Sequence, residues 1–185
     1  MRPRRSITPV VEGTAAVTGV DFFASLVRSV ALALEVRYAF VAECDPAKKT
    51  RASSLAFWNG DGFGNNFEYD VRHTPCEKVV EGETCYYARD LQQLFPLSEG
   101  LAQLGSVSYL GIPIVGASGD VIGHFVVMDD KPMGESPRGL SILKTFAARA
   151  GAELDRQRAA EELRTAPVEV DSLKNRLNAE TGYLH

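Results

Sequence analysis

The sequence predicts an α+β domain with one central antiparallel β-sheet of five or six strands, flanked by helices and followed by a helical heptad tail. The first observation is the stretch 108–130, in which two apolar strands enclose a short turn at 116–120, a pattern typical of a hairpin. The second is a series of strand patterns before it with short connections, which imply antiparallel pairing. The third is an amphipathic helix pattern at each end of the strand series.

The first part of the chain predicts a leader, a helix and several strands. Residues 1–18 show no hydrophobic periodicity and are expected to form a mobile leader. Asp21 is expected to cap a helix that reaches Leu34, because apolar residues recur every three or four positions between them. Strands are expected at 38–43, 53–58 and 67–71.

The segment 74–105 predicts short helical pieces in a long irregular insert between the third strand and the hairpin. Connections of this length usually carry function. In the hairpin both strands are apolar at nearly every position, which indicates that both faces of the sheet are covered. His124 is the polar exception, and Ile122 and Val126 are expected beside it on the same face.

The C-terminal part predicts a packed helix that begins at Pro137, and then a helical linker at 165–185. Apolar residues recur seven apart at Leu163, Val170, Leu177 and Leu184, with Ala166 and Leu173 as a second seam. This heptad pattern favours a coiled coil with another copy, although a plain amphipathic helix or a fraying end fits the same residues. Pro167 counts against one continuous helix, because proline removes a backbone donor.

Composition places the chain among ordinary globular proteins: of its 185 residues, 45% are hydrophobic and 24% are charged. The net charge of −4, without a basic face, argues against a nucleic-acid binder. No apolar stretch reaches the roughly 18 residues of a membrane span, and no secretory pattern follows the basic start. The odd count of three cysteines does not make a disulfide framework, so a cytoplasmic protein without nucleic-acid or membrane partners is expected.

Residues capable of chemistry gather at the start of the insert: Cys76 and Cys85 lie within it, and His73 directly precedes it. A closed zinc site needs four such ligands, so no metal site is predicted. Two buried thiols or a redox pair remain open for the cysteines. Phosphate-loop, dinucleotide-binding and nucleophile-elbow motifs are all absent. No catalytic residue and no cofactor is therefore assigned, and the chain is not expected to be an enzyme.

Two motifs resemble the most recognisable part of GAF domains: YLGIPI at 109–114 and GDVIGH at 119–124. The earlier run from Thr74 to Pro96 also resembles that family. This resemblance gives a GAF sensory domain at 19–164. It implies a central antiparallel sheet with the first and last helices on one face and the insert on the other, where the insert roofs a small-molecule pocket.

The tail resembles a narrower group. Residues 168–184 are similar to the helical linker of bacterial enhancer-binding transcriptional activators of the formate-hydrogenlyase-activator type, in which a GAF sensor precedes an ATPase and a helix-turn-helix domain. Sensor histidine kinases carry similar GAF domains. The GAF-type free methionine-(R)-sulfoxide reductases use cysteines near Cys76 and Cys85 but need another just before residue 109, where 101–107 contains none.

The resulting hypothesis is a non-catalytic sensory domain that dimerises through its terminal helices and passes a small-molecule signal to the output domain of a transcriptional regulator. The residues expected at the ligand are Phe57, Tyr69, Cys76, Tyr86, Tyr109 and His124. The residues expected at the dimer interface are Leu26, Val30, Leu143, Phe146, Ala150 and Leu154. The alternatives are a GAF-type reductase or cysteine redox sensor, a histidine kinase sensor, and a dimerisation module without a ligand.

Overall fold

Six strands form one antiparallel sheet in the computed structural model, which describes the backbone of residues 20–45 and 47–182 and the side chains of 22–45 and 47–165. The strands are β1 (Tyr38–Cys44), β2 (Arg51–Asn59), β3 (Glu68–Asp70), β4 (Cys85–Tyr87), β5 (Ser108–Val115) and β6 (Val121–Asp129). Their order across the sheet is β3-β2-β1-β6-β5-β4. The predicted fold class is confirmed, and the sixth strand is the short β4 inside the insert, which pairs with β5.

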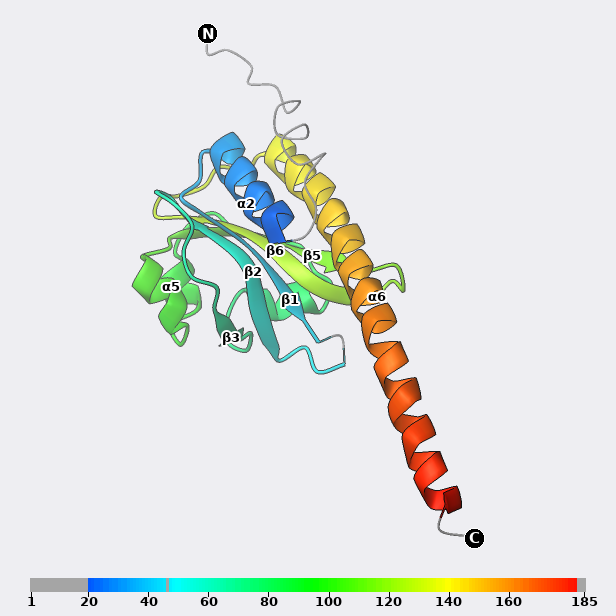
Figure 1. The fold of residues 1–185 in the computed structure, drawn as a ribbon. Coiled ribbons are helices and arrows are strands. Elements are labelled where there is room, and N and C mark those ends of the chain that lie inside the picture. Colours follow the sequence, from blue (N-terminus) through cyan, green and yellow to red (C-terminus); the bar gives the residue numbers. More distant parts are fainter. Residues whose placement is uncertain (1–19, 46, 183–185) are drawn as a thin grey trace.

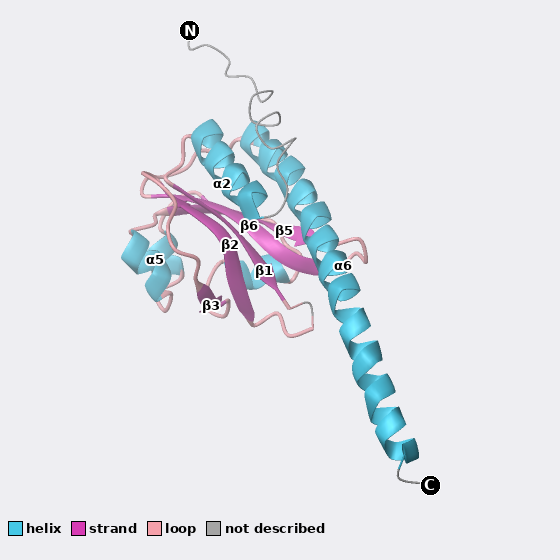
Figure 2. Ribbon diagram, viewed as in Figure 1, coloured by secondary structure: helices cyan, strands magenta, loops and turns pink. Residues whose placement is uncertain are grey.

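Helices cover both faces of this sheet. Helix α2 (Val20–Leu34) and helix α6 (Pro137–Gly182) lie on one face (Figure 1). The insert, residues 74–105, carries α3 (Cys76–Val80), α4 (Leu91–Leu94) and α5 (Glu99–Leu104), whose buried residues belong to the core on the other face. Figure 2 shows the sheet as the middle layer. Within the described residues, no helix is both long and apolar enough to cross a membrane.

Two apolar cores, one on each face of the sheet, account for the nearly continuous apolar character of the central strands. On β6, Phe125 and Val127 face α2 and α6, whereas Val126 and Met128 face the insert. Burying a side chain of this size contributes roughly 1.5–3 kcal/mol. The strand is therefore stabilised from both sides, as its sequence predicts.

The six residues predicted to form a dimer interface lie instead in the core of a single chain. Leu26, Val30, Leu143, Phe146, Ala150 and Leu154 are each at most 2% exposed. They belong to the cluster that packs α2 and α6 against the sheet. Their helical periodicity marks the face that turns inward within one chain, so contacts with a second copy would require outward-facing residues of these helices.

A β-bulge in β6 changes which residues lie on the same face of the sheet as His124. Ile122 is an extra residue between the pairs that β6 makes with Ile114 and Val115 of β5. It packs on the helix side, whereas the ring of His124 contacts that of Phe40 on the insert side. The prediction that Ile122 shares the face of His124 is wrong, because a bulge interrupts the alternation of side chains along a strand.

Gly123 follows the bulge at a point where β6 comes unusually close to β1. A Cβ atom at this position would lie 2.3 Å from the backbone oxygen of Ala42, far inside van der Waals contact. Because the obstructing atom belongs to the backbone of a central strand, rotation of a side chain cannot relieve the clash. The close approach of the two strands therefore requires glycine.

Helix α6 is continuous from Pro137 to Gly182, so the break expected at Pro167 does not occur. A helix can accommodate an internal proline at the cost of one backbone hydrogen bond and a local kink. The residues 159–165 just before it are exposed, so no packing against the sheet opposes such an adjustment. The heptad side chains from Ala166 onward, like the leader at 1–18, lie outside the described residues.

We predict that Gly123→Ala lowers the free energy of unfolding by at least about 2 kcal/mol, because the strands must separate to admit the methyl group. Urea denaturation followed by circular dichroism measures this change. Gly100→Ala is the matched control, since a Cβ atom there meets nothing within 4 Å. Alanine also favours helix α5, so this variant should be as stable as the wild type or more stable by up to about 1 kcal/mol. Equal stability of Gly123→Ala and the wild type would contradict the close approach.

Candidate functional site

A cavity of about 390 Å³ lies between the insert and the sheet, and we call it the insert cavity. Its floor is apolar and largely aromatic, formed by Phe40, Phe67, Tyr69, Tyr109 and Met128. Its walls come from α5 and from the segment that leads from β3 into α3. A cavity at this place agrees with the pocket implied by the family resemblance, and its floor is complementary to an apolar body.

Polar groups stand at the rim of the insert cavity. Arg72 and Asp70 form an ion pair in which Arg72 Nε donates to Asp70 Oδ1 at 2.9 Å and to Oδ2 at 3.0 Å. The guanidinium holds the pKa of the Asp70 carboxyl well below its usual range. Because both side chains are largely exposed to solvent, the pair contributes little to stability. It does fix one cation and one anion at the mouth of the cavity.

Hydrogen bonds fix the side chains that form and support the floor. Tyr69 Oη is hydrogen-bonded to His124 Nε2, and Cys76 Sγ lies 3.2 Å from the hydroxyl oxygen of Tyr109. The hydroxyl of Thr74 accepts from the backbone N–H of Cys76 at 3.2 Å, which holds the start of α3. An unpaired buried polar group would cost about 1–3 kcal/mol, so these bonds determine where the rings and the thiol lie.

His124 is fully buried, and burial lowers its pKa to about 4 because it penalises the charged imidazolium. The ring is therefore neutral near pH 7. Its Nδ1 atom has no hydrogen-bond partner among the described residues. His124 thus supports the floor as a neutral ring that holds Tyr69, and does not present a positive charge to a ligand.

The three cysteines are buried free thiols. Burial raises the pKa of Cys44, Cys76 and Cys85, and at Cys76 the hydrogen bond from Tyr109 opposes this shift only in part. A thiol with a raised pKa carries little thiolate at neutral pH and is a poor nucleophile. Among the described side chains, no group of three or more His, Cys, Asp or Glu residues is placed to hold a metal ion.

The structure brings most of the predicted ligand residues to one side of the sheet. Tyr69, Cys76 and Tyr109 line the insert cavity. Phe57 and His124 belong to the same layer but lie behind the lining, where Phe57 is packed in the core and His124 contacts Tyr69. These two residues can shape the cavity only through their neighbours.

Tyr86 lies on the opposite face of the sheet, against the core beneath α2 and α6. Its neighbours in β4, Cys85 and Tyr87, face the insert. Side chains alternate along a strand, so Tyr86 points away from the insert cavity. The expectation that it shares a ligand with Tyr69 is not met, because the sequence of the insert does not show that residues 85–87 form a strand.

Sequence reasoning missed several residues of the insert cavity. Phe40 could have been found, because it alternates with its neighbours in the predicted strand 38–43 and so shares the face of Tyr38. Met128 could have been found in the same way, because it lies two residues after Val126 on β6 and therefore shares its face, the face of the insert. Leu101 gave no such signal, because the segment around it carries no period. Arg72 follows the predicted strand 67–71 at a polar position of its alternation, which indicates exposure to solvent but not a place at a cavity.

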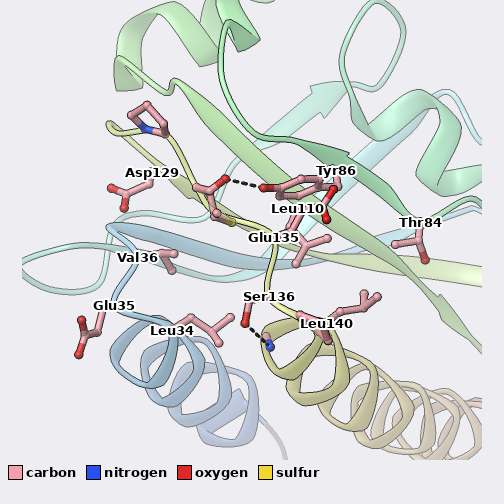
Figure 3. A pocket seen from close by; sticks show the side chains of 15 residues that line it. Leu34, Glu35, Val36, Thr84, Tyr86, Leu110, Asp129, Glu135, Ser136 and Leu140 are labelled. Carbon is pink, nitrogen blue, oxygen red and sulfur yellow. Dashed lines mark hydrogen bonds between the residues drawn. The ribbon is translucent and has the colours of Figure 1, made fainter. Parts of the chain in front are cut away.

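A second cavity, of about 580 Å³, lies on the other face of the sheet, and we call it the helix cavity. Figure 3 shows the end of α2 with Leu34 and the start of α6 with Leu140 on one side, and Tyr86 and Leu110 of the strands across from them. The loop 131–136 closes it from the side of β6.

The family comparison agrees with this architecture. The sequence matches the GAF domain family over residues 7–154, which is most of the chain. The chain belongs to the GAF domain family. The resemblance seen in the motifs at 109–114 and 119–124 is thereby confirmed. No curated protein matches the sequence.

Solved structures share the fold. The GAF domain of an Acinetobacter phosphoenolpyruvate-protein phosphotransferase superposes with a TM-score of 0.67 at 18% identity, over 84% of this chain and 94% of that one. A far-red absorbing protein in its dark state with bound biliverdin IXa gives 0.65 at 9% identity, over 82% and 98%. The GAF domain of A. aeolicus nlh2 in an inactive state gives 0.58 at 13%, over 84% and 94%. At these identities the similarity establishes the fold alone.

We predict that stability falls as the pH is lowered from about 6.5 to about 4, because the pKa of His124 is about 4 in the folded protein and about 6.5 in the unfolded chain. The unfolded state therefore binds more protons in this window. The contribution is about 3 kcal/mol, fully present above pH 6.5 and lost as the pH falls through the folded pKa. Chemical denaturation at a series of pH values measures it.

The variant His124→Gln should remove this pH dependence while keeping a partner for the Tyr69 hydroxyl. His73→Gln is the matched control, since His73 is exposed, and it should retain the wild-type dependence. If His124→Gln and the wild type lost stability in parallel between these pH values, the buried neutral imidazole would not be its source.

Proposed function

We propose that this GAF domain is a non-catalytic cytoplasmic sensor of a small molecule and that the ligand occupies the insert cavity. The observation that carries the proposal is the cavity itself. About 390 Å³ stays open between sheet and insert, although aromatic and aliphatic side chains fill the rest of that layer. Small-molecule sites are typically cavities of roughly 300–1,000 Å³ with apolar linings and a few polar groups.

The lining indicates the kind of ligand. The rings of Phe40, Phe67 and Tyr109 suit a flat apolar body. Arg72 and Asp70 at the rim suit a polar or charged end group, because each offers one charge beside the opening. A protein of the same fold holds biliverdin IXa, which supports a ligand-binding role for the fold without identifying the ligand of this chain.

The state of the thiols supports a role without catalysis. Reduction of a sulfoxide by cysteine begins with attack by a thiolate, and all three thiols are buried with raised pKa values. Cys76 is also held by the Tyr109 hydroxyl at 3.2 Å. These features favour structural thiols over a reductase centre or a redox pair.

A short loop offers a route from the insert to α6. The loop 131–136 leads into α6 and is tied to the insert at two points: the Met133 N–H donates to the Ala88 carbonyl at 2.9 Å, and the Tyr86 hydroxyl donates to the Met133 carbonyl. A ligand that shifts the insert can thereby bias the start of α6. It can do so only by the difference in its affinity for the two arrangements, typically worth ~1–3 kcal/mol.

In this proposal α6 carries the signal, in a dimer, to the output domain of a bacterial transcriptional regulator of the enhancer-binding type. Helix α6 extends well beyond the part of it that packs on the sheet (Figure 1). Leu163, the first position of the heptad pattern, is 76% exposed in one chain. An exposed leucine at such a position is available for contact with a second α6.

We predict that the protein carries a co-purifying small molecule, or responds to one from a metabolite panel, with a rise in melting temperature. At a hundredfold excess over the dissociation constant, binding adds about 2.7 kcal/mol of stability, which corresponds to about 5–10 °C for a domain of this size. Mass spectrometry of the denatured protein identifies bound molecules, and thermal denaturation with and without each compound measures the response.

Gly100→Trp should abolish that rise, because Gly100 lines the insert cavity and has open space around it for a larger side chain. Leu32→Trp is the control, since Leu32 is 53% exposed on α2 across the sheet, and this variant should respond as the wild type does. The proposal fails if no compound is found, or if Gly100→Trp responds to a compound as strongly as Leu32→Trp.

We predict that the chain is dimeric at micromolar concentration and that Leu163→Glu weakens the dimer about tenfold or more, because it places a charge at the helix seam. Light scattering coupled to size-exclusion chromatography measures the mass. Leu94→Glu is the matched control, because Leu94 is a comparably exposed leucine of the insert, and it should remain dimeric. A wild-type chain that stays monomeric would remove the dimer from the proposal.

A further inference from the structure

The helix cavity is a built space with a fixed wall. Its floor is apolar, formed by Leu34, Val36, Leu110 and Leu140. The ring of Tyr86 stands in its wall, held in place because the Tyr86 hydroxyl donates to the Met133 carbonyl. At about 580 Å³ it is larger than the insert cavity, and the sheet separates the two.

All the charged side chains that line the helix cavity are carboxylates. Glu35, Asp129 and Glu135 line it, and no lysine, arginine or histidine does so among the described residues. The cation whose charge acts on Asp129 is Lys131, which is not among the residues that line the cavity, and Arg37 is engaged by the neighbouring Asp130 at 2.6 Å. The cavity therefore combines an apolar floor with negative charge.

The environment of these carboxylates favours a cation at this place. Burial raises the pKa of Asp129 above its usual range, because the carboxylate has lost part of its hydration. Burial and the charge of Glu135 raise the pKa of Tyr86, whereas the charge of Arg89 lowers it. The charge of a cation between the two carboxylates would act in the opposite direction on both pKa values, and an aromatic ring beside carboxylates is a typical setting for an organic ammonium group.

We propose that the helix cavity binds a small organic cation, with its apolar part on the leucine floor and its ammonium group between Asp129, Glu135 and the ring of Tyr86. The site is separate from the insert cavity and does not depend on the function proposed for it. A bare metal ion fits less well, because no group of three or more ligating side chains is placed together within the described part of the chain.

Titration of the ¹⁵N-labelled full chain with 4-phenylbutylamine tests this, with the neutral 4-phenylbutanol as the matched ligand. We expect saturable shifts of the Tyr86 and Leu140 amide signals with the amine, and binding of the alcohol weaker by about tenfold or more, because the alcohol lacks the charge. The variant Gly100→Trp should bind the amine as the wild type does, which separates this site from the insert cavity.

The double variant Asp129→Asn, Glu135→Gln should weaken amine binding by about tenfold or more. Asparagine can still accept the hydrogen bond that Asp129 takes from the backbone N–H of Asp130, so the fold should be retained, as circular dichroism can verify. Glu81→Gln, at an exposed carboxylate elsewhere, is the control and should bind normally. Equal binding of amine and alcohol, undiminished binding by the double variant, or no saturable shift at Tyr86 and Leu140 would each overturn the proposal.

Discussion

Burial of the central strands on both faces is the constraint on which the rest of the structure depends. With α2 and α6 on one side and the insert on the other, a polar group on these strands must find its partner inside the protein. The bond between Tyr69 and His124 and the contact between Cys76 and Tyr109 meet that demand, while Nδ1 of His124 has no partner among the described residues. The same dense packing leaves room only for glycine at position 123.

Two cavities remain where this packing is incomplete, and their linings differ in kind. Aromatic rings, the ion pair of Arg72 with Asp70, and Glu99 line the insert cavity, whereas the charged side chains that line the helix cavity are all carboxylates. The loop 131–136 touches both systems, because it walls the helix cavity and is bonded to the insert at Ala88 and Tyr86. If both cavities take ligands, thermodynamic linkage requires that each ligand change the affinity of the other by the same factor.

Five of the six strands and the two terminal helices were predictable, because hydrophobic periodicity can be read from the local sequence. What the periodicity could not say is which partner an apolar stripe meets: Leu26 and Leu143 fit a dimer seam and a core equally well, and the structure places them in the core. The bulge at Ile122 and the strand at 85–87 depend on pairing with distant strands. The floor of the insert cavity was therefore predicted only in part, and Tyr86 was assigned to the wrong face.

Helix α6 contains 46 residues without a break, and at a rise of 1.5 Å per residue it forms a rod about 69 Å long. Its first turns rest on the sheet and its far end stands clear of the domain (Figure 1). Such a rod behaves as a lever: a small tilt or rotation at its seated base becomes a much larger displacement at its tip. A movement at the base of α6 that is too small to alter the packing of the domain would therefore still displace the far end of the helix.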